Sequence, residues 1–336
     1  MKSIPNKFDS QNLYQIISEA PKQLLQAFRE TRFSIPQDSR KIVFCGMGGS
    51  ASPADLLRTF LRNCEKKNDL VIESNRDYTF PNNIDSSWVG IFCSYSGNTE
   101  ETVSALKLAA KYHLKDIIVI AHGKDLEKIA KARKYKFIQV PDTKQPRMSY
   151  CYILGALLKL LANSKIIALN EKALTNDVNL IIKNEKNIIK LGQSIAKKLQ
   201  GFVPIVYTSE RWRALSGIWK INFNENAKIP SFYNVFPELN HNEIVGFTNS
   251  IGKYQIIVLV DPAEHPRILK RIKITESLLK NKIKFQIIRL PGKSAFSKML
   301  FTIMLGLYAS YFLAINYKID PTPVKIVEKL KVLMTK

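Results

Sequence analysis

The stretch Val89–Thr102, "VGIFCSYSGNTEET", joins a short apolar run to a group of hydroxyl side chains. Its first part, Val89–Cys93, is apolar throughout, as is typical of a strand in a parallel sheet that is covered on both faces. Ser94, Ser96 and Thr99 follow, and the segment after them has the periodicity of an amphipathic helix. The chain therefore presents hydroxyl groups where it leaves a buried strand and enters a helix.

The same alternation of apolar runs and helical patterns continues along the chain. After a helical stretch at Ser10–Glu30, the predicted strands of the first half are Lys41–Cys45, Leu70–Glu73, Val89–Cys93, Asp116–Ala121 and Lys136–Val140. Pro204–Tyr207 and Tyr254–Val260 repeat the pattern. Residues 135–162 and 283–314 both run from a strand through a proline-containing loop into a long apolar helix. This internal similarity predicts two α/β units with parallel sheets, joined near Asn163–Asn179.

The composition restricts the expected partners and compartment. Fifty-one Lys and Arg residues against 28 Asp and Glu leave a net charge of +23, which favours anionic partners or a lysine-rich solvated surface. No helix-turn-helix or RNA-binding signature is present, so nucleic acid is not the expected partner. The four cysteines form no C-x-x-C pair, and the N-terminus lacks an apolar signal region, so we expect a cytoplasmic protein. Met299–Tyr317, without a charge, predicts a buried core or dimer-interface helix rather than a membrane span.

Two loops indicate a phosphate site. The glycines of Gly46–Ala51, "GMGGSA", allow the backbone to approach a ligand, and Ser50 is placed to cap the next helix. Ser94, Ser96 and Thr99 add neutral donors at a second helix N-terminus, with Gly97 allowing a tight turn. The alternatives are simple helix caps, or a dinucleotide-binding G-x-G-x-x-A motif with Glu73 as the ribose-binding acid. A dinucleotide site would leave the hydroxyl cluster without a role.

Together with three further motifs, these loops carry a family resemblance. "NRDYTFP" (75–81), "NENAKIP" (224–230) and "ELNHNEIVGF" (238–247) follow in the same order as in the bifunctional phosphoglucose/phosphomannose isomerases. The chain resembles that family from about residue 40 to its C-terminus. The resemblance implies two flavodoxin-like, doubly wound sugar-isomerase (SIS) domains at 39–165 and 166–336, after a helical segment at 1–38. It also implies an aldose–ketose isomerase of sugar 6-phosphates that uses a cis-enediol(ate) and neither metal nor redox cofactor.

The resemblance also implies roles for individual residues. Gly49, Ser50, Ser94, Ser96 and Thr99 would hold the substrate phosphate, Glu225 would be the general base, and Arg147 would stabilise the enediolate. His241 would assist ring opening from the neighbouring subunit of a homodimer. Lys331, or alternatively Lys329, would enter the site from the C-terminal segment.

Two departures and two alternatives bear on the activity. The glycine loop ends in Ala51 where the family commonly has Gly, and a Thr linked to mannose 6-phosphate use corresponds to Val324, with Thr322 nearby. Isomerisation of glucose 6-phosphate is therefore the main expectation, and mannose 6-phosphate use stays open. An isomerase of another phosphosugar, or a non-catalytic SIS protein that senses a phosphosugar, are the alternatives. The presence of Glu225, His241 and Arg147 together favours an enzyme over a sensor.

Overall fold

The computed structural model describes residues 7–64, 69–249 and 251–334 and divides into two compact units. The N-terminal unit consists of Glu19–Lys183 and Gly292–Leu300. The C-terminal unit consists of Met1–Ser18, Asn184–Pro291 and Phe301–Lys336. These units follow packing rather than chain order, so the domain limits drawn from the sequence (1–38, 39–165 and 166–336) stay a prediction.

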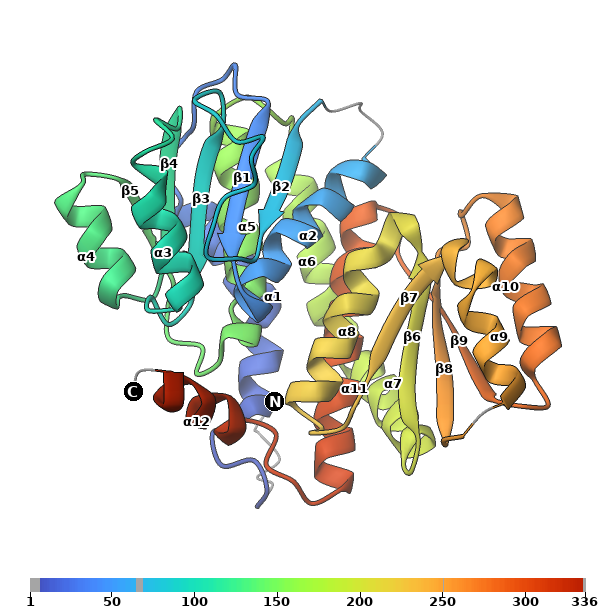
Figure 1. Ribbon diagram of the computed structural model, residues 1–336. Helices are drawn as coiled ribbons and strands as arrows, with labels where there is room; N and C mark the ends of the chain where they lie inside the picture. Colours follow the sequence, from blue (N-terminus) through green and yellow to red (C-terminus); the bar gives the residue numbers. More distant parts are fainter. Residues whose placement is uncertain (1–6, 65–68, 250, 335–336) are drawn as a thin grey trace. The chain divides into compact units, whose positions relative to one another are not determined.

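The N-terminal unit is built on a five-stranded parallel sheet (Figure 1). Its strands are β1 (Lys41–Gly46), β2 (Val71–Asn75), β3 (Val89–Ser94), β4 (Asp116–Ala121) and β5 (Lys136–Gln139), in the order β2-β1-β3-β4-β5. This is the flavodoxin-like order, in which the direction of winding reverses between β1 and β3. Ligands of such sheets bind at the carboxyl ends of the two strands that flank the reversal.

Helices cover both faces of this sheet. Right-handed crossovers place the helix after β1 and the helix after β3 on opposite faces, because the chain then winds in opposite directions. Side chains of α3 and α4 pack with Val43, Phe92 and Val119 on one face. The helices are α1 (Leu13–Glu30), which continues from the other unit, α2 (Gly48–Asn63), α3 (Glu100–Ala109), α4 (Lys124–Ala132), α5 (Tyr150–Asn163) and α6 (Glu171–Lys183), with the 3-10 turn η1 (Pro146–Met148).

The C-terminal unit repeats the topology with one strand fewer. Its strands are β6 (Val203–Ser209), β7 (Phe232–Phe236), β8 (Tyr254–Val260) and β9 (Lys284–Arg289), all parallel, in the order β7-β6-β8-β9. Its longer helices are α7 (Glu185–Leu199), α8 (Arg213–Glu225), α10 (Pro266–Leu279) and α12 (Lys325–Met334). Shorter turns are η2 (Glu210–Trp212), η3 (Glu238–His241), α9 (Glu243–Gly246) and η4 (Phe247–Asn249). The prediction of two parallel α/β units is confirmed.

One strand of the second sheet is absent from the sequence-based prediction. β7 has five residues, "FYNVF", and lies between Pro230 and Pro237. It is the edge strand of its sheet, and only its last two residues are fully buried. A short edge strand that is half exposed lacks the continuous apolar run by which the other strands were predicted.

The long apolar helix is α11 (Ala295–Asn316), whose residues belong to both units. Within the described residues, it is the one helix long and apolar enough to cross a membrane. Seventy-eight per cent of its most apolar window is buried inside the protein. The expectation of a buried helix is therefore confirmed.

A glycine in α5 provides a test of how closely the helices of the N-terminal unit pack. A Cβ at Gly155 would lie 2.2 Å from the carbonyl oxygen of Leu24, and backbone cannot withdraw as a side chain can. We expect Gly155→Ala to destabilise the protein by about 1–3 kcal/mol. In contrast, a Cβ at Gly217 of α8 meets its nearest atom at 3.8 Å, so Gly217→Ala should stabilise the helix by up to about 1 kcal/mol. Urea unfolding of both variants measures this, and a Gly155→Ala protein as stable as wild type would contradict the packing.

Candidate active site

Three hydroxyl groups converge directly after β3, as the sequence predicted. Ser94 Oγ lies 2.7 Å from Thr99 Oγ1 and 3.3 Å from Ser96 Oγ, and Ser96 Oγ lies 3.4 Å from Thr99 Oγ1. Thr99 occupies the N-cap position of α3, yet its side chain makes no capping hydrogen bond. The capping interpretation therefore does not account for Thr99, and the three hydroxyls instead form a polar cluster beside the first N–H groups of α3.

Gly97 makes this cluster sterically feasible. Its φ of +72° lies in the left-handed region, and a Cβ would be 1.7 Å from the carbonyl oxygen of Gly123. The Gly97 carbonyl accepts a hydrogen bond from the N–H of Leu126 in the first turn of α4, at 2.9 Å, and its own N–H donates to Ser94 Oγ at 3.1 Å. No other residue fits here, because both the conformation and the close approach exclude a side chain.

The loop after β1 is shorter than the sequence suggested. α2 begins at Gly48 and Met47 is its N-cap residue, so Ser50 lies inside the first turn and the prediction that it caps the helix was wrong. Ser50 Oγ accepts a hydrogen bond from the N–H of Tyr95 at 3.0 Å. The residue therefore joins the loops after β1 and β3, the two strands at which the winding reverses.

Tyr95 was not singled out from the sequence, although it connects four loops. Its N–H reaches Ser50, and its carbonyl accepts from the N–H of His122 at 3.0 Å. Its hydroxyl donates to Asp142 Oδ1 at 2.8 Å and accepts from the N–H of Thr143 at 2.9 Å. Its position between Ser94 and Ser96, in the turn that follows β3, is the signal that could have identified it.

The titration behaviour of this linkage follows from its contacts. A hydrogen bond from the Lys144 ammonium, assisted by the Lys144 N–H and the Tyr95 hydroxyl, lowers the pKa of Asp142 to about 2. Burial, assisted by the hydrogen bond to Asp142, raises the pKa of Tyr95. Asp142 therefore remains a carboxylate and Tyr95 a neutral phenol at ordinary pH, which keeps the linkage between the loops intact.

Gly49 and Arg147 meet at the same edge of the sheet. A Cβ at Gly49 would lie 2.7 Å from the backbone nitrogen of Arg147, so only glycine allows η1 to approach α2 this closely. The Arg147 side chain is fully buried, and its NH1 donates to Gln145 Oε1 at 3.1 Å. Within the N-terminal unit, the structure thus brings together six predicted site residues: Gly49, Ser50, Ser94, Ser96, Thr99 and Arg147.

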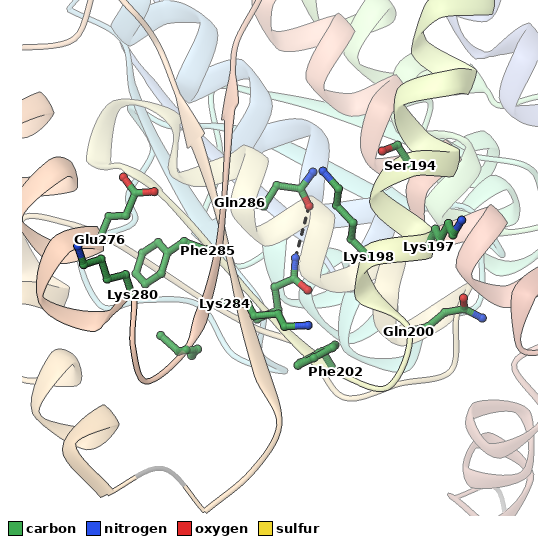
Figure 2. Close-up of a pocket in the computed structure, with 12 residues that line it drawn as sticks. Ser194, Lys197, Lys198, Gln200, Phe202, Glu276, Lys280, Lys284, Phe285 and Gln286 are labelled. Atoms are coloured by element: carbon green, nitrogen blue, oxygen red, sulfur yellow. Dashed lines mark hydrogen bonds between the residues drawn. The ribbon is translucent and has the colours of Figure 1, made fainter.

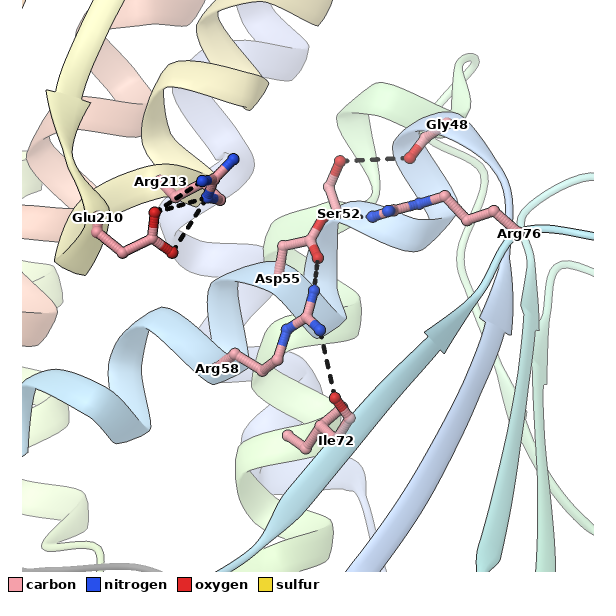
Figure 3. A network of polar contacts seen from close by, with 8 residues as sticks. All are labelled: Gly48, Ser52, Asp55, Arg58, Ile72, Arg76, Glu210 and Arg213. Carbon is pink, nitrogen blue, oxygen red and sulfur yellow. Dashed lines mark hydrogen bonds and ion pairs between the residues drawn. The ribbon is translucent and has the colours of Figure 1, made fainter. Parts of the chain in front are cut away.

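The motif "NRDYTFP" flanks this group through an ion-pair network on α2 (Figure 3). Asp55 of α2 pairs with both Arg58 and Arg76, the latter at 2.5 Å, and Arg58 also donates to the carbonyl of Ile72 at 3.2 Å. The second arginine pair drawn there, Glu210 with Arg213, belongs to the C-terminal unit and joins the ends of η2 and α8 at 2.7 Å. The Asp55 network anchors the loop after β2 to α2.

Glu225 ends α8 in the C-terminal unit. The helix buries Leu215, Ile218 and Trp219 and is therefore directed into the core. Its end is held by Lys228, whose ammonium donates to the carbonyls of Glu225 and of Pro321, the latter at 3.1 Å. Asn226 donates to Ser310 Oγ of α11 at 2.9 Å. The motif "NENAKIP" is therefore a closed turn that fixes the position of Glu225.

Asn222 is a second polar residue of this helix that the sequence analysis missed. It lies one turn before Glu225, is fully buried, and neither of its side-chain polar atoms has a hydrogen-bond partner among the described residues. Residues three apart share one helix face. Since buried amides are nearly always hydrogen-bonded, an unpaired one beside Glu225 points to a bound ligand.

The structure separates Glu225 from His241 within one chain. α8 starts at the carboxyl end of β6 and runs back along the sheet (Figure 1). Glu225 is its last residue and therefore lies toward the amino ends of the strands. His241 follows the carboxyl end of β7 and is exposed. A five-residue strand spans about 17 Å, which is too far for both side chains to reach one substrate carbon.

The C-terminal segment places Lys331 and Lys329 on α12. Every side chain of this helix from Lys325 to Met334 is exposed. Thr322, just before it, is fully buried, whereas Val324 is half-buried. Neither lysine is therefore held against the body of the C-terminal unit.

The loops that correspond to the hydroxyl cluster in the second sheet carry acids instead. After β8 come Asp261 and Glu264, both buried, and Glu264 accepts a hydrogen bond from Ser209, the last residue of β6. Arg211 pairs with Glu264 at 3.6 Å. Buried carboxylates would repel a phosphate at this reversal point, so the hydroxyl cluster is a feature of the first sheet.

Solved structures share this fold. A hypothetical protein from Thermus thermophilus has a TM-score of 0.73 to this chain, covering 97% of it and 90% of the other chain at 16% identity. The C-terminal domain of glucosamine-fructose-6-phosphate aminotransferase from Francisella tularensis has a TM-score of 0.70, covering 93% and 98% at 14% identity. These likenesses confirm the doubly wound α/β fold.

Curated relatives identify the family. The chain is 34% identical over 338 residues to the bifunctional phosphoglucose/phosphomannose isomerase of Caldicellulosiruptor bescii, covering 95% of this chain and 98% of the relative. The enzyme of the same name from Aquifex aeolicus is 32% identical over 86% and 89%. The D-glucosamine-6-phosphate 4-epimerase of Sulfolobus acidocaldarius is 30% identical over 87% and 89%.

Residues 189–334 match the family described as the bacterial phospho-glucose isomerase C-terminal SIS domain. The relatives cover nearly the whole chain, including both sheets and the hydroxyl cluster. The chain therefore belongs to the bifunctional phosphoglucose/phosphomannose isomerase family.

Proposed function

We propose that this protein is a cytoplasmic aldose–ketose isomerase that interconverts glucose 6-phosphate and fructose 6-phosphate, with mannose 6-phosphate as a further substrate. The observation that carries the proposal is the cluster of Ser94, Ser96 and Thr99, whose hydroxyls face one another instead of capping α3. The names of the relatives support the substrates.

The cluster suits the phosphate of a sugar 6-phosphate. The first N–H groups of α2 and α3 have no partner within their helices, and both helix N-termini carry partial positive charge. Hydroxyls donate to phosphate oxygens without bringing charges that would need a counter-ion. Ser50 and Gly49, in the first turn of α2, complete the proposed pocket at the reversal point between β1 and β3.

The isomerisation needs one proton moved between two neighbouring carbons. The Glu225 carboxylate removes the proton from C2 of the open-chain aldose and returns it to C1. The oxygen on C2 loses its hydroxyl proton and the oxygen on C1 gains one, so the aldehyde becomes a hydroxyl and the hydroxyl a ketone. Arg147 stabilises the negative charge of the enediolate between the two steps. His241 donates a proton to the ring oxygen as the ring opens, and Lys331, or Lys329, approaches from α12.

A homodimer would explain why Glu225 and His241 lie at opposite ends of the strands of one sheet. In a two-fold dimer, each copy supplies His241 to the site that holds Glu225 of its partner. α12 supports a partner surface, since it exposes Ile326 by 82%, Leu330 by 58% and Val332 by 59%. A second copy would remove such apolar side chains from water.

Two other activities fit parts of the evidence. The epimerase relative acts, by its name, on glucosamine 6-phosphate, so a protein with this degree of similarity carries out a different reaction on a sugar 6-phosphate. A non-catalytic sensor would need the phosphate loops alone. Glu225, held in place by its closed turn, favours an enzyme.

Turnover separates these activities. We expect purified protein to convert fructose 6-phosphate to glucose 6-phosphate in the presence of a chelator, and Glu225→Gln to abolish this because an amide accepts no proton. The same assay with mannose 6-phosphate and glucosamine 6-phosphate measures substrate breadth. Turnover by the Glu225→Gln protein would remove this residue from the mechanism, and a wild-type protein that converts only glucosamine 6-phosphate would favour the epimerase.

The phosphate loops are tested by binding. Ser96→Ala combined with Thr99→Ala removes two hydroxyls, and each hydrogen bond to a charged group contributes about 1.5–3 kcal/mol, so affinity for fructose 6-phosphate should fall roughly hundredfold or more. Ser104→Ala, on the exposed side of α3, is the control and should bind as wild type. Calorimetric titration gives both affinities. An unchanged affinity in the double variant would place the phosphate elsewhere.

The shared site is tested by mixing variants. Glu225→Gln and His241→Ala proteins should each be inactive alone. After subunit exchange, random pairing restores one intact site in half of the dimers, so roughly a quarter of wild-type activity should return. Mixtures that stay inactive, although size-exclusion chromatography shows mixed dimers, would place both residues in one subunit's site.

A further inference from the structure

The C-terminal unit contains a groove that the proposed reaction does not use (Figure 2). It encloses about 910 Å³ at the amino ends of β6, β8 and β9, beside the last turns of α7 and α10. Glu225 precedes β7, at the other end of the strand order β7-β6-β8-β9. Neither α8 nor β7 contributes a residue to the lining of the groove, so the groove does not include the proposed catalytic residue.

Lysines dominate the groove. Lys197 and Lys198 come from α7, Lys280 follows α10, and Lys284 begins β9. Glu276 is the single acid among the described residues that line the groove. We call the groove that these four lysines line the lysine groove. Within the described residues, no hydrogen bond or ion pair engages the ammonium groups of Lys197, Lys198 and Lys280. The ammonium of Lys284 lies 4.3 Å from the ring centroid of Phe202.

Helix geometry accounts for part of this cluster. Lysines in the last turn of a helix offset the negative end of its dipole, which explains Lys197, Lys198 and Lys280 without a ligand. Lys284 lies on a strand and is not explained in this way. The helix dipoles also do not explain the incomplete hydrogen bonding of two glutamines in the groove wall.

Gln255 is buried in the wall of the groove, with 3% of its surface exposed. Its Nε2 donates to Gln286 Oε1 over a long 3.5 Å, and its Oε1 has no hydrogen-bond partner among the described residues. Lys198 and Gln286 both line the groove (Figure 2). Buried amides are nearly always hydrogen-bonded, so this incompletely bonded pair points to a ligand that completes it.

We propose that the lysine groove binds a small anion that carries a chain of phosphates. Four lysines against one glutamate leave an excess of three positive charges, more than the two negative charges of a phosphate monoester, so a chain of phosphates matches the groove better. Lysine ammoniums bind phosphate oxygens as point charges, and the amides of Gln255 and Gln286 reorient to donate to them. The volume falls within the range of small-molecule sites, about 300–1,000 Å³.

Calorimetric titration of the full chain with inorganic tripolyphosphate and with ATP, at low salt, tests the proposal. We expect Lys198→Gln combined with Lys284→Gln to weaken binding of both at least tenfold. The control is Lys190→Gln combined with Lys273→Gln, two exposed lysines of α7 and α10 outside the groove, which changes the net charge equally. An equal loss in the control would overturn the proposal, because diffuse charge would then explain the binding. Absence of binding by the wild type would also overturn it.

The titrations also show whether the groove recognises only the phosphate chain or a whole nucleotide, and whether the anion binds at the groove or at the sugar-phosphate loops. Equal affinity for both anions means that the phosphate chain alone is recognised, and tighter binding of ATP means that the groove also holds the base. Both results support the proposal. The Ser96→Ala, Thr99→Ala protein should bind tripolyphosphate as wild type does. A loss there would assign the anion to the sugar-phosphate loops and overturn the assignment to the groove, whatever the outcome for the isomerase activity.

Gln255→Met provides an independent readout of the buried amide. Methionine has a similar volume and no unpaired polar atom, so the melting temperature of the ligand-free variant should rise above that of wild type. The further increase that tripolyphosphate produces should be smaller than in wild type. An undiminished increase would show that the amide does not contact the anion.

Discussion

The contact between Gly97 and Gly123 is the constraint on which the arrangement of the site depends. A single methyl group at Gly97 would overlap the Gly123 carbonyl oxygen at 1.7 Å, so the loops after β3 and β4 meet through backbone alone. This contact places the hydroxyls of Ser94, Ser96 and Thr99 within 3.4 Å of one another. Tyr95 then joins the same loops to those after β1 and β5. The hydroxyl cluster is thus held by the frame of the sheet and not by a flexible turn.

The two sheets have the same topology but carry different side chains at the carboxyl ends of their strands. Both wind in the flavodoxin-like order, and in both the winding reverses beside the first strand of the unit. At the reversal of the first sheet stand neutral hydroxyls and helix N-termini, whereas at that of the second sheet stand the buried carboxylates Asp261 and Glu264. These charges favour an anion at the reversal point of the first sheet. Glu225 and His241, which we propose act on one substrate, lie at opposite ends of the strands of the second sheet.

The positively charged side chains have different surroundings in the two units. In the N-terminal unit, several arginines and lysines are engaged in ion pairs, such as those of Asp55 with Arg58 and Arg76. In the C-terminal unit, lysines gather around the groove at the amino ends of the strands, where two helices also end. Part of the net charge of +23 therefore comes from the lysines gathered around this groove, whereas arginines such as Arg58 and Arg76 have an acidic partner.

The sequence by itself determined the fold class, most of the strands and the identity of the hydroxyl cluster. Apolar runs and turn residues are local signals, and both the parallel sheets and the loops after β1 and β3 follow from them. The sequence missed β7, Tyr95 and Asn222, and it placed Ser50 at a helix cap that Met47 occupies. Only the tertiary structure decided these features, because each depends on which segments distant in sequence pack together. The separation of Glu225 from His241 has the same origin. The strand β7 lies between them in the chain, and because it runs the length of the sheet it places them at opposite ends of the strands, although only 16 positions apart in the sequence.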